Sequence, residues 1–372
     1  MPTTDDSSWR TVDVPHDFVL EGQFAAENSI NQGFLPYGVG WYRKHFELPS
    51  NARESSKWID FDGVMVACVV YINGHWLGNH TSGYTPFRLH LENSMLRWDG
   101  KPNLLAVRAD ASQAALDWLD SWYYEGGGIY RHVTLTVAAP VHIAQYGVYC
   151  PATVDLTSID SAASTGDAVL NVSVDLKNAG SQPTTVTVTV FTTHNATTIT
   201  DAGAWLSSST SVIMSPNSSR SIVLPVITMP RVALWSVRSP ALHKLVTEVR
   251  QGTTLLDQVN TSFGIRHIVF DPDRGFLLNN EPTKIIGACM HQDFGGVGTA
   301  VPDTIQWHRV RKLQSVGFNG WRTAHNPPTP ALLDATDQLG MLVWDENHRV
   351  DRLDEVETLV RRDRNHPSVV IW

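Results

Sequence analysis

The segment from Asn319 to Pro328, NGWRTAHNPP, concentrates side chains that could take part in chemistry. It overlaps an apolar strand candidate, Phe318 to Trp321, and then places an arginine, a histidine and an asparagine ahead of a proline pair. A strand that ends in polar, titratable residues and then turns is typical of the carboxyl face of a parallel α/β barrel, where active sites lie. We therefore expect Arg322, His325 and Asn326 to line a substrate pocket.

Two further strand candidates end in similar residues. His291 and Asp293 follow one apolar run, and four polar residues follow another: Asp345, Glu346, Asn347 and His348. Such a residue can also cap the next helix, and for Asp345 or His348 alone that interpretation is favoured. Three successive strands that end this way favour a shared pocket, because the carboxyl ends of barrel strands meet at one rim.

The residue types of this pocket are compatible with two kinds of chemistry. Its histidines and Asp293 could bind zinc or manganese, so a metallohydrolase is one alternative. The sequence has no His-x-His or His-Glu-x-x-His pair, however, to supply two ligands at a rigid spacing. The planar and bidentate groups of Arg, Asn, Asp and His suit hydrogen bonds to a neutral polyol better.

The elements that must position these residues begin after Phe270, where the apolar period changes from two to about 3.6. Strand and helix candidates then alternate, which predicts a parallel sheet with crossover helices. The strands are expected at 284–290, 318–321, 341–344 and 368–372, and the helices at 304–316, 329–340 and 352–362.

The region before Pro140 has the pattern of an all-β domain. Apolar and polar residues alternate in the segment GWYRKHFELP, and the β-prone segment from Lys57 to Ile72 runs into Asn73-Gly74. An Asn-Gly pair between such segments predicts a hairpin with a type I′ turn. Strands are also expected at 103–109 and 132–137, with the aromatic and glycine-rich loop WLDSWYYEGGGIYR between them.

Residues 141–267 have a different composition, rich in Ser, Thr and Val and poor in charge. Leu170 to Leu176 and Thr185 to Val190 alternate strictly, and turn residues separate the strands. We expect a second β-sandwich of immunoglobulin type, without a cluster of titratable residues, that acts as a spacer. The predicted domains are therefore 1–140, 141–267 and 268–372.

Composition narrows the function further. The net charge is −9 without a Lys/Arg block, which disfavours nucleic-acid binding. No apolar run is long enough to span a membrane, and no signal peptide is visible. The compartment, secreted or cytoplasmic, stays open. Thirteen tryptophans could provide stacking platforms for sugars, although core packing is the favoured interpretation for most of them.

These segments together resemble glycoside hydrolase family 2, the β-galactosidase, β-glucuronidase and β-mannosidase group. The matching segments run almost end to end, in the family's order: VDVPHDF, GVGWYRKHF, YINGHWLG, EGGGIYRHV, SFGIR, MHQDFGGVG, NGWRTAHNPPTP, LVWDE and RNHPSVVIW. The His-Gln-Asp and Arg-Thr-Ala-His-Asn-Pro-Pro segments are most similar to those of β-galactosidases. The resemblance implies a jelly-roll sugar-binding domain, an immunoglobulin-like sandwich and the first half of a (β/α)8 TIM barrel.

The resemblance also assigns roles to residues. His291 and His325 match residues that contact the bound sugar, and Arg322 matches an arginine near the catalytic carboxylates. Asp120 is our choice for the acidic residue that the first domain sends into the pocket. Asp293 and Asn326 complete the expected substrate contacts, and Asp345 and Glu346 are expected behind them.

The family cleaves β-glycosides with retention of configuration, using two glutamates about 5 Å apart. The resemblance places both beyond Trp372, so the chain as given is expected to be inactive. It implies a terminal β-D-galactoside or related oligosaccharide as substrate, no required cofactor, a possible Mg or Na ion in the full-length enzyme, and a possible homo-oligomer. The alternatives are a non-catalytic carbohydrate-binding protein and a β-glucuronidase or β-mannosidase specificity.

Overall fold

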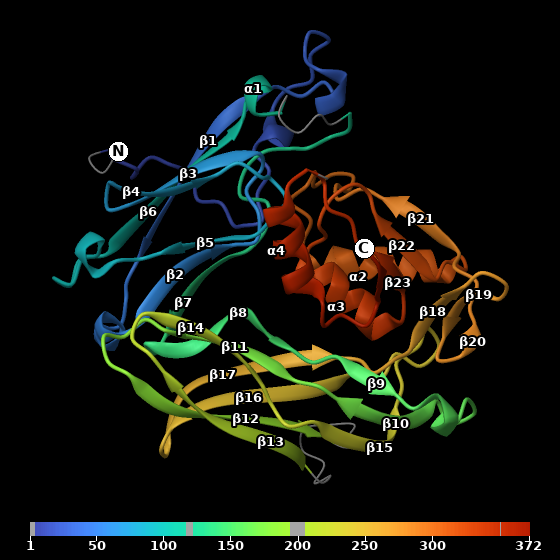
Figure 1. The fold of residues 1–372 in the computed structure, drawn as a ribbon. Helices are drawn as coiled ribbons and strands as arrows, with labels where there is room; N and C mark the ends of the chain where they lie inside the picture. The colour runs from blue at the N-terminus through green and yellow to red at the C-terminus, as the bar shows by residue number, and fades with distance from the viewer. Residues whose placement is uncertain (1–3, 117–121, 194–204, 350) are drawn as a thin grey trace.

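The first region of the chain folds into two antiparallel sheets that face each other as a jelly-roll sandwich (Figure 1). The computed structural model describes residues 4–116, 122–193, 205–349 and 351–372. One sheet has the order β1-β6-β3-β4 and the other β5-β2-β7. Their bounds are β1 Gly38–Phe46, β2 Ser56–Phe61, β3 Ala67–Ile72, β4 His75–His80, β5 Phe87–His90, β6 Asn103–Ala111 and β7 Val133–Ala138, with the short helix α1 at Gln113–Leu116.

The predicted Asn-Gly hairpin is confirmed. It joins β3 to β4, and Asn73 and Gly74 have φ values of 50° and 87°, as a type I′ turn requires. The alternation predicted for this domain directs Phe61, Val70 and Val107 into one apolar core.

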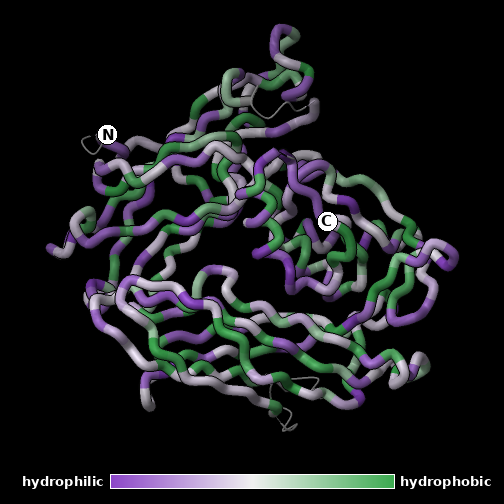
Figure 2. Tube along the Cα trace, in the orientation of Figure 1, coloured by the Kyte–Doolittle hydropathy of each residue, from purple (hydrophilic) through white to green (hydrophobic). Residues whose placement is uncertain are grey.

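The second region is an immunoglobulin-like β-sandwich, as its alternating sequence predicts. Its inward residues form the largest apolar core of the described chain, and Figure 2 shows the hydrophobic segments that run along these strands. The three sheets have the orders β15-β10-β9, β14-β11-β8 and β13-β12-β16-β17. The strands are β8 Val141–Tyr149, β9 Ala152–Val154, β10 Thr165–Leu170, β11 Ser173–Asn178, β12 Thr184–Thr193, β13 Trp205–Met214, β14 Ser218–Val223, β15 Ile227–Ala233, β16 His243–Gln251 and β17 Thr254–Phe263.

The third region contains the parallel sheet β21-β22-β23-β24 with crossover helices, the beginning of a TIM barrel. A small antiparallel sheet, β18 Ile268–Asp271, β19 Gly275–Leu278 and β20 Glu281–Pro282, precedes it. The barrel elements are β21 Gly287–Met290, α2 Asp303–Ser315, β22 Gly320–Thr323, α3 Pro330–Leu339, β23 Leu342–Trp344, α4 Leu353–Asp363 and β24 Val369–Ile371.

Helix α3 has both ends that its sequence predicts. Thr329 caps the amino end by accepting from the amide of Leu332 at 3.3 Å, and Pro330 occupies the first turn. Gly340 ends the helix in the left-handed conformation, with φ 75°, which glycine adopts without steric cost.

The predicted position of the second barrel strand is wrong by two residues. The side chain of Asn319 donates to Lys284 O at 2.9 Å and accepts from Ile286 N at 2.7 Å. These contacts hold the two segments together just before the paired strands, which begin at Gly287 in β21 and at Gly320 in β22. The pairing continues to Thr323, so Arg322 lies within β22 instead of after it.

Candidate active site at the carboxyl ends of the barrel strands

The Arg322 side chain lies on the face of the parallel sheet that is turned away from helices α2 and α3. It lies between Cys289 of β21 and Trp344 of β23 in the strand register. Its Nη1 donates to Cys289 Sγ at 3.3 Å, and its guanidinium carbon lies 5.3 Å from the centre of the Trp344 ring. The preceding residue, Trp321, points the other way and is buried against α2 and α3. The period of two along β22 therefore directs a cation inward and its apolar neighbour toward the helices.

Arg322, Glu346 and His325 form a hydrogen-bonded network that links the ends of β22 and β23. Arg322 Nη2 donates to Glu346 Oε1 at 2.6 Å and lies 3.1 Å from His325 Nδ1. Glu346 is itself positioned by its amide, which donates to Thr323 Oγ1 at 2.9 Å. The hydrogen bond to Glu346 raises the pKa of Arg322 above its usual value, so the arginine stays charged. Because a guanidinium can only donate, His325 Nδ1 accepts in this contact, and the ring proton on Nε2 can be donated to a ligand.

His291 lies next to His325 at the end of β21. The two ring centres are 5.5 Å apart and the rings are nearly perpendicular, at 79°. Burial lowers the pKa of His291, against the opposing effect of the nearby Asp293 carboxylate. A lowered pKa keeps the imidazole neutral, in the form that can both donate and accept a hydrogen bond.

Two aromatic residues of the first domain cover these histidines. Tyr123 meets the His291 ring edge-on at 4.5 Å, and Trp122 lies 5.9 Å from both His291 and His325. Trp122 is 67% exposed, so its ring stands at the open edge of the site. Sequence reasoning did not select these two residues, although the aromatic and glycine-rich loop that carries them was visible.

Residues of the first domain and of the barrel both hold Tyr123 in place. Its hydroxyl lies 3.3 Å from His348 Nδ1 and 3.4 Å from the hydroxyl of Tyr84. His348 Nδ1 also lies 2.9 Å from the carbonyl oxygen of His325. Tyr123 is thus held against the loop that follows β22.

Buried polar contacts dock the first domain onto the barrel. Arg131 Nη2 donates to Pro327 O at 2.7 Å. Asp17 Oδ2 accepts from Tyr124 at 2.8 Å and from the amide of Thr299 at 3.1 Å. Gly298 has φ 59°, and a β-carbon there would collide with the Asp17 carboxylate, so glycine permits this close approach.

The predicted site residues fall into three groups in the structure. His291, His325, Arg322 and Glu346 come together, and Asp293 lies close enough to affect the pKa of His291. Asn326 is buried, with 2% of its surface exposed, in the turn that follows β22. Asp120 lies outside the described residues.

Asp345, which was expected behind the substrate-contacting residues, does not line the pocket. It is 1% exposed, its amide donates to Ile371 O at 2.9 Å, and its carboxyl lies against Arg362 and Asp363 of α4. Burial and the neighbouring Asp363 carboxylate raise the pKa of Asp345 well above its usual value. The alternation along the strand end sends Asp345 outward and Glu346 inward.

No group of three or more His, Cys, Asp and Glu side chains within the described ranges is arranged to hold a metal ion. No helix of the described residues is long and apolar enough to span a bilayer.

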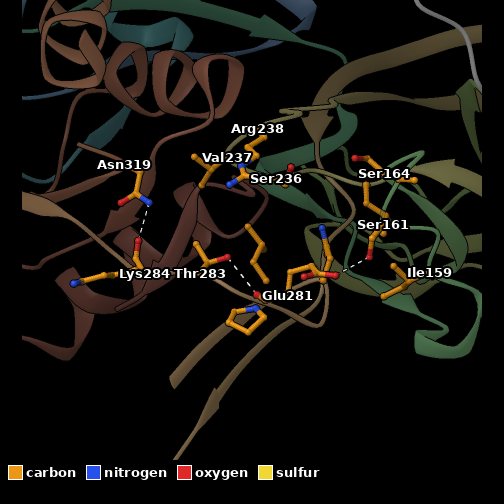
Figure 3. A pocket seen from close by; sticks show the side chains of 15 residues that line it. Ile159, Ser161, Ser164, Ser236, Val237, Arg238, Glu281, Thr283, Lys284 and Asn319 are labelled. Atoms are coloured by element: carbon orange, nitrogen blue, oxygen red, sulfur yellow. Dashed lines mark hydrogen bonds between the residues drawn. The ribbon is translucent and has the colours of Figure 1, made fainter. Parts of the chain in front are cut away.

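A hollow of about 710 Å³ lies between the second domain and the start of the third (Figure 3). Ser161 donates to Glu281 at 2.8 Å on its wall, and Asn319 and Lys284 close one side. Both of these last residues precede barrel strands, so the hollow is at the amino ends of the strands. Barrel enzymes carry their chemistry at the opposite, carboxyl face, which is where Arg322 and the histidines lie.

The chain thus combines a jelly-roll sandwich, an immunoglobulin-like sandwich and the start of a parallel βα barrel, with a polar pocket at the carboxyl ends of the barrel strands. Three family models match this chain in order. They are the sugar binding domain of glycosyl hydrolases family 2 at residues 7–140, the glycosyl hydrolases family 2 model at 152–266, and the family's TIM barrel domain at 272–352. The chain belongs to glycosyl hydrolase family 2.

Curated relatives have different specificities. A β-galactosidase of Bacteroides ovatus is 35% identical over 99% of this chain, which spans 43% of that protein. A putative β-glucuronidase of Formosa agariphila is 30% identical over 99% of the chain and 34% of its own length. The chain therefore spans less than half the length of these two relatives.

Solved structures are similar over the whole chain. A family 2 glycosyl hydrolase of Bacteroides cellulosilyticus has a TM-score of 0.86 and 31% identity, with 100% of this chain and 49% of that chain covered. A β-glucuronidase of Bacteroides uniformis has a TM-score of 0.83 and 26% identity, with 99% and 43% covered.

Proposed function

We propose that this chain forms the substrate-binding half of a retaining glycosidase that removes terminal β-D-galactosyl residues. The network of Arg322, Glu346 and His325 beside His291 is the observation that carries the proposal. It presents neutral and charged hydrogen-bonding groups of the kind that bind sugar hydroxyls, at the barrel face where such enzymes act. Trp122 and Tyr123 add an aromatic wall, against which the C–H face of a pyranose ring can pack.

The charges around the pocket favour a neutral sugar over a uronic acid. Arg322 is paired with Glu346, and Arg131 donates to the carbonyl oxygens of Pro327 and Tyr84. Arg309 donates to His291 O. The arginines at the described part of the site are thus already engaged, whereas a glucuronide carboxylate would require a cation available to it. The relatives include both β-galactosidases and β-glucuronidases, and this argument supports the galactosidase specificity.

The groups that break the bond are proposed to come from a segment that follows Trp372. A retaining mechanism needs two carboxyl groups about 5 Å apart, one to protonate the leaving oxygen and one to attack the anomeric carbon. Glu346 is engaged by Arg322, and Asp345 is buried against α4. In this proposal Arg322 keeps its charge beside the reacting carboxylates, while His291 and His325 orient the sugar.

The test compares the 372-residue chain with the product of its complete open reading frame on nitrophenyl β-D-galactoside, β-D-glucuronide and β-D-mannoside. We expect the longer product to prefer the galactoside and to release the β-anomer first, as seen by NMR, and the 372-residue chain to be inactive. A preference for the glucuronide would refute the specificity. Turnover by the 372-residue chain that is lost in Glu346→Gln would refute the assignment of the bond-breaking groups.

A further inference from the structure

A row of aromatic residues crosses the outer face of the sheet β1-β6-β3-β4. Trp41 of β1 is 43% exposed and Trp76 of β4 is 58% exposed, and Tyr71 of β3 lies half-buried between them. In Figure 1 this sheet lies on the side of the first sandwich away from the immunoglobulin-like domain. Large aromatic side chains that remain exposed together mark a surface for interaction more often than isolated ones do.

The strand register makes the row continuous. Tyr71 is directly opposite Trp76 across the hairpin, where side chains stand about 5 Å apart. A bulge after Val70 turns Leu77 into the core and keeps Trp76 on the outer face. The sequence of the hairpin thus places both rings on the same side of the sheet.

Trp41 and Tyr71 stack although β6 separates their strands. Their ring centres are 6.3 Å apart and the planes differ by 25°. Ala106 of β6, the register partner of Tyr71, lies on the same face and is 8% exposed. Its small side chain leaves room for the two rings to approach each other. The row spans three strand spacings, about 14 Å, which suits a short oligosaccharide rather than a single sugar.

Two arginines beside the row are paired with carboxylates. Arg108 Nη1 donates to Asp110 at 2.7 Å, and Arg43 lies 3.1 Å from Asp6. The flat apolar rings therefore stand beside paired charges, which matches a neutral ligand better than a nucleic acid or an acidic polysaccharide.

We propose that this aromatic row, Trp41, Tyr71 and Trp76, is a second carbohydrate site that binds a neutral hexose polymer through the C–H faces of successive pyranose rings. It lies on a different sheet from the pocket around Arg322, and it does not depend on the hydrolytic activity. Its effect would be to hold the protein on a polymer that bears cleavable ends.

The experiment is native affinity electrophoresis of the 372-residue chain in gels that contain a soluble neutral β-(1→4)-galactan or hydroxyethylcellulose. We expect at least one of these polymers to retard the chain. The double variant Trp41→Ala/Trp76→Ala should have a dissociation constant at least about tenfold larger. Trp41→Phe/Trp76→Phe, which keeps flat rings, should regain part of the binding. Phe270→Ala removes an aromatic side chain, 57% exposed, from another domain, and is the matched control.

Arg322→Ala should leave the retardation unchanged, because the binding does not use the pocket. If circular dichroism shows that the double variant does not fold, Trp76→Ala alone replaces it in the same test. The proposal is overturned if neither polymer retards the chain, or if the alanine variants are retarded as strongly as the original. It is also overturned if sedimentation shows that Trp76→Ala converts a dimer to a monomer, because the face then joins two copies of this chain.

Discussion

Arg322 Nη2 and Glu346 Oε1 are 2.6 Å apart, and this contact ties the inner face of β22 to the end of β23. Only 28% of the arginine side chain and 22% of the glutamate side chain are exposed. A charge-assisted contact in such a partly enclosed setting is stronger than one at the surface. It fixes the guanidinium relative to His325, and the first prediction follows from this geometry.

Arg322→Lys should lower kcat/KM of the complete enzyme by about 100-fold, because a lysine cannot hold Glu346 and His325 at once and the sugar would shift. Steady-state kinetics on nitrophenyl β-D-galactoside measures the loss. Arg274→Lys, in a pair with Asp271 at an exposed turn, is the control and should be as active as the unmodified enzyme. Full activity of Arg322→Lys would show that the network is not used.

Tyr123 should act mainly through its ring. Tyr123→Phe keeps the edge-on contact with His291 at 4.5 Å and loses only the hydroxyl contacts near 3.3 Å. We expect a KM close to the original for Tyr123→Phe and a KM raised about tenfold or more for Tyr123→Ala, because the aromatic wall is then missing. Equal effects of both substitutions would mean that the hydroxyl, not the ring, is what matters.

Asp345 should make stability depend on pH. Its folded-state pKa is raised, by burial and by Asp363, so the folded protein holds a proton that the unfolded chain releases above about pH 4. Stability from this group is therefore present at low pH and lost as pH rises toward the folded pKa. Asp345→Asn imitates the protonated form and should reduce the fall in Tm between about pH 5 and pH 8.

A matched control for this titration is Asp354→Asn. Asp354 is an exposed carboxylate whose pKa is lowered by its hydrogen bond to Arg352, so it is ionised at both pH values. The difference in Tm between them should therefore not change in this variant. An Asp345→Asn protein with the original pH profile would show that Asp345 does not retain a proton in the folded state.

Arg266 should be important for joining the second domain to the barrel. Its guanidinium donates to the carbonyl oxygens of Pro367 and Val369, and burial lowers its pKa to about 10. Arg266→Ala leaves two buried acceptors without this donor, at a cost of about 1–3 kcal/mol for each unsatisfied group. Urea unfolding monitored by tryptophan fluorescence measures the loss. Arg250→Ala, on an exposed part of β16, is the control, and its free energy of unfolding should be close to that of the original protein.

The local elements of this protein follow from its sequence. The Asn73-Gly74 turn, the Thr329 cap and the Gly340 end of α3 each depend on residues within a few positions of one another. The alternation of apolar residues likewise determined which side of each sandwich strand faces the core. Residue order alone also indicated that His291, Arg322 and His325 would meet, because successive parallel strands end at one rim.

The tertiary structure decided what the local pattern could not. Pairing of β22 with β21 extends to Thr323, which places Arg322 within the strand. Packing of α4 drew Asp345 away from the pocket while Glu346 turned toward Arg322. Trp122 and Tyr123 reach His291 from about 170 positions earlier in the chain, because the first sandwich docks on the barrel, and such a contact depends on how whole domains pack rather than on any periodicity.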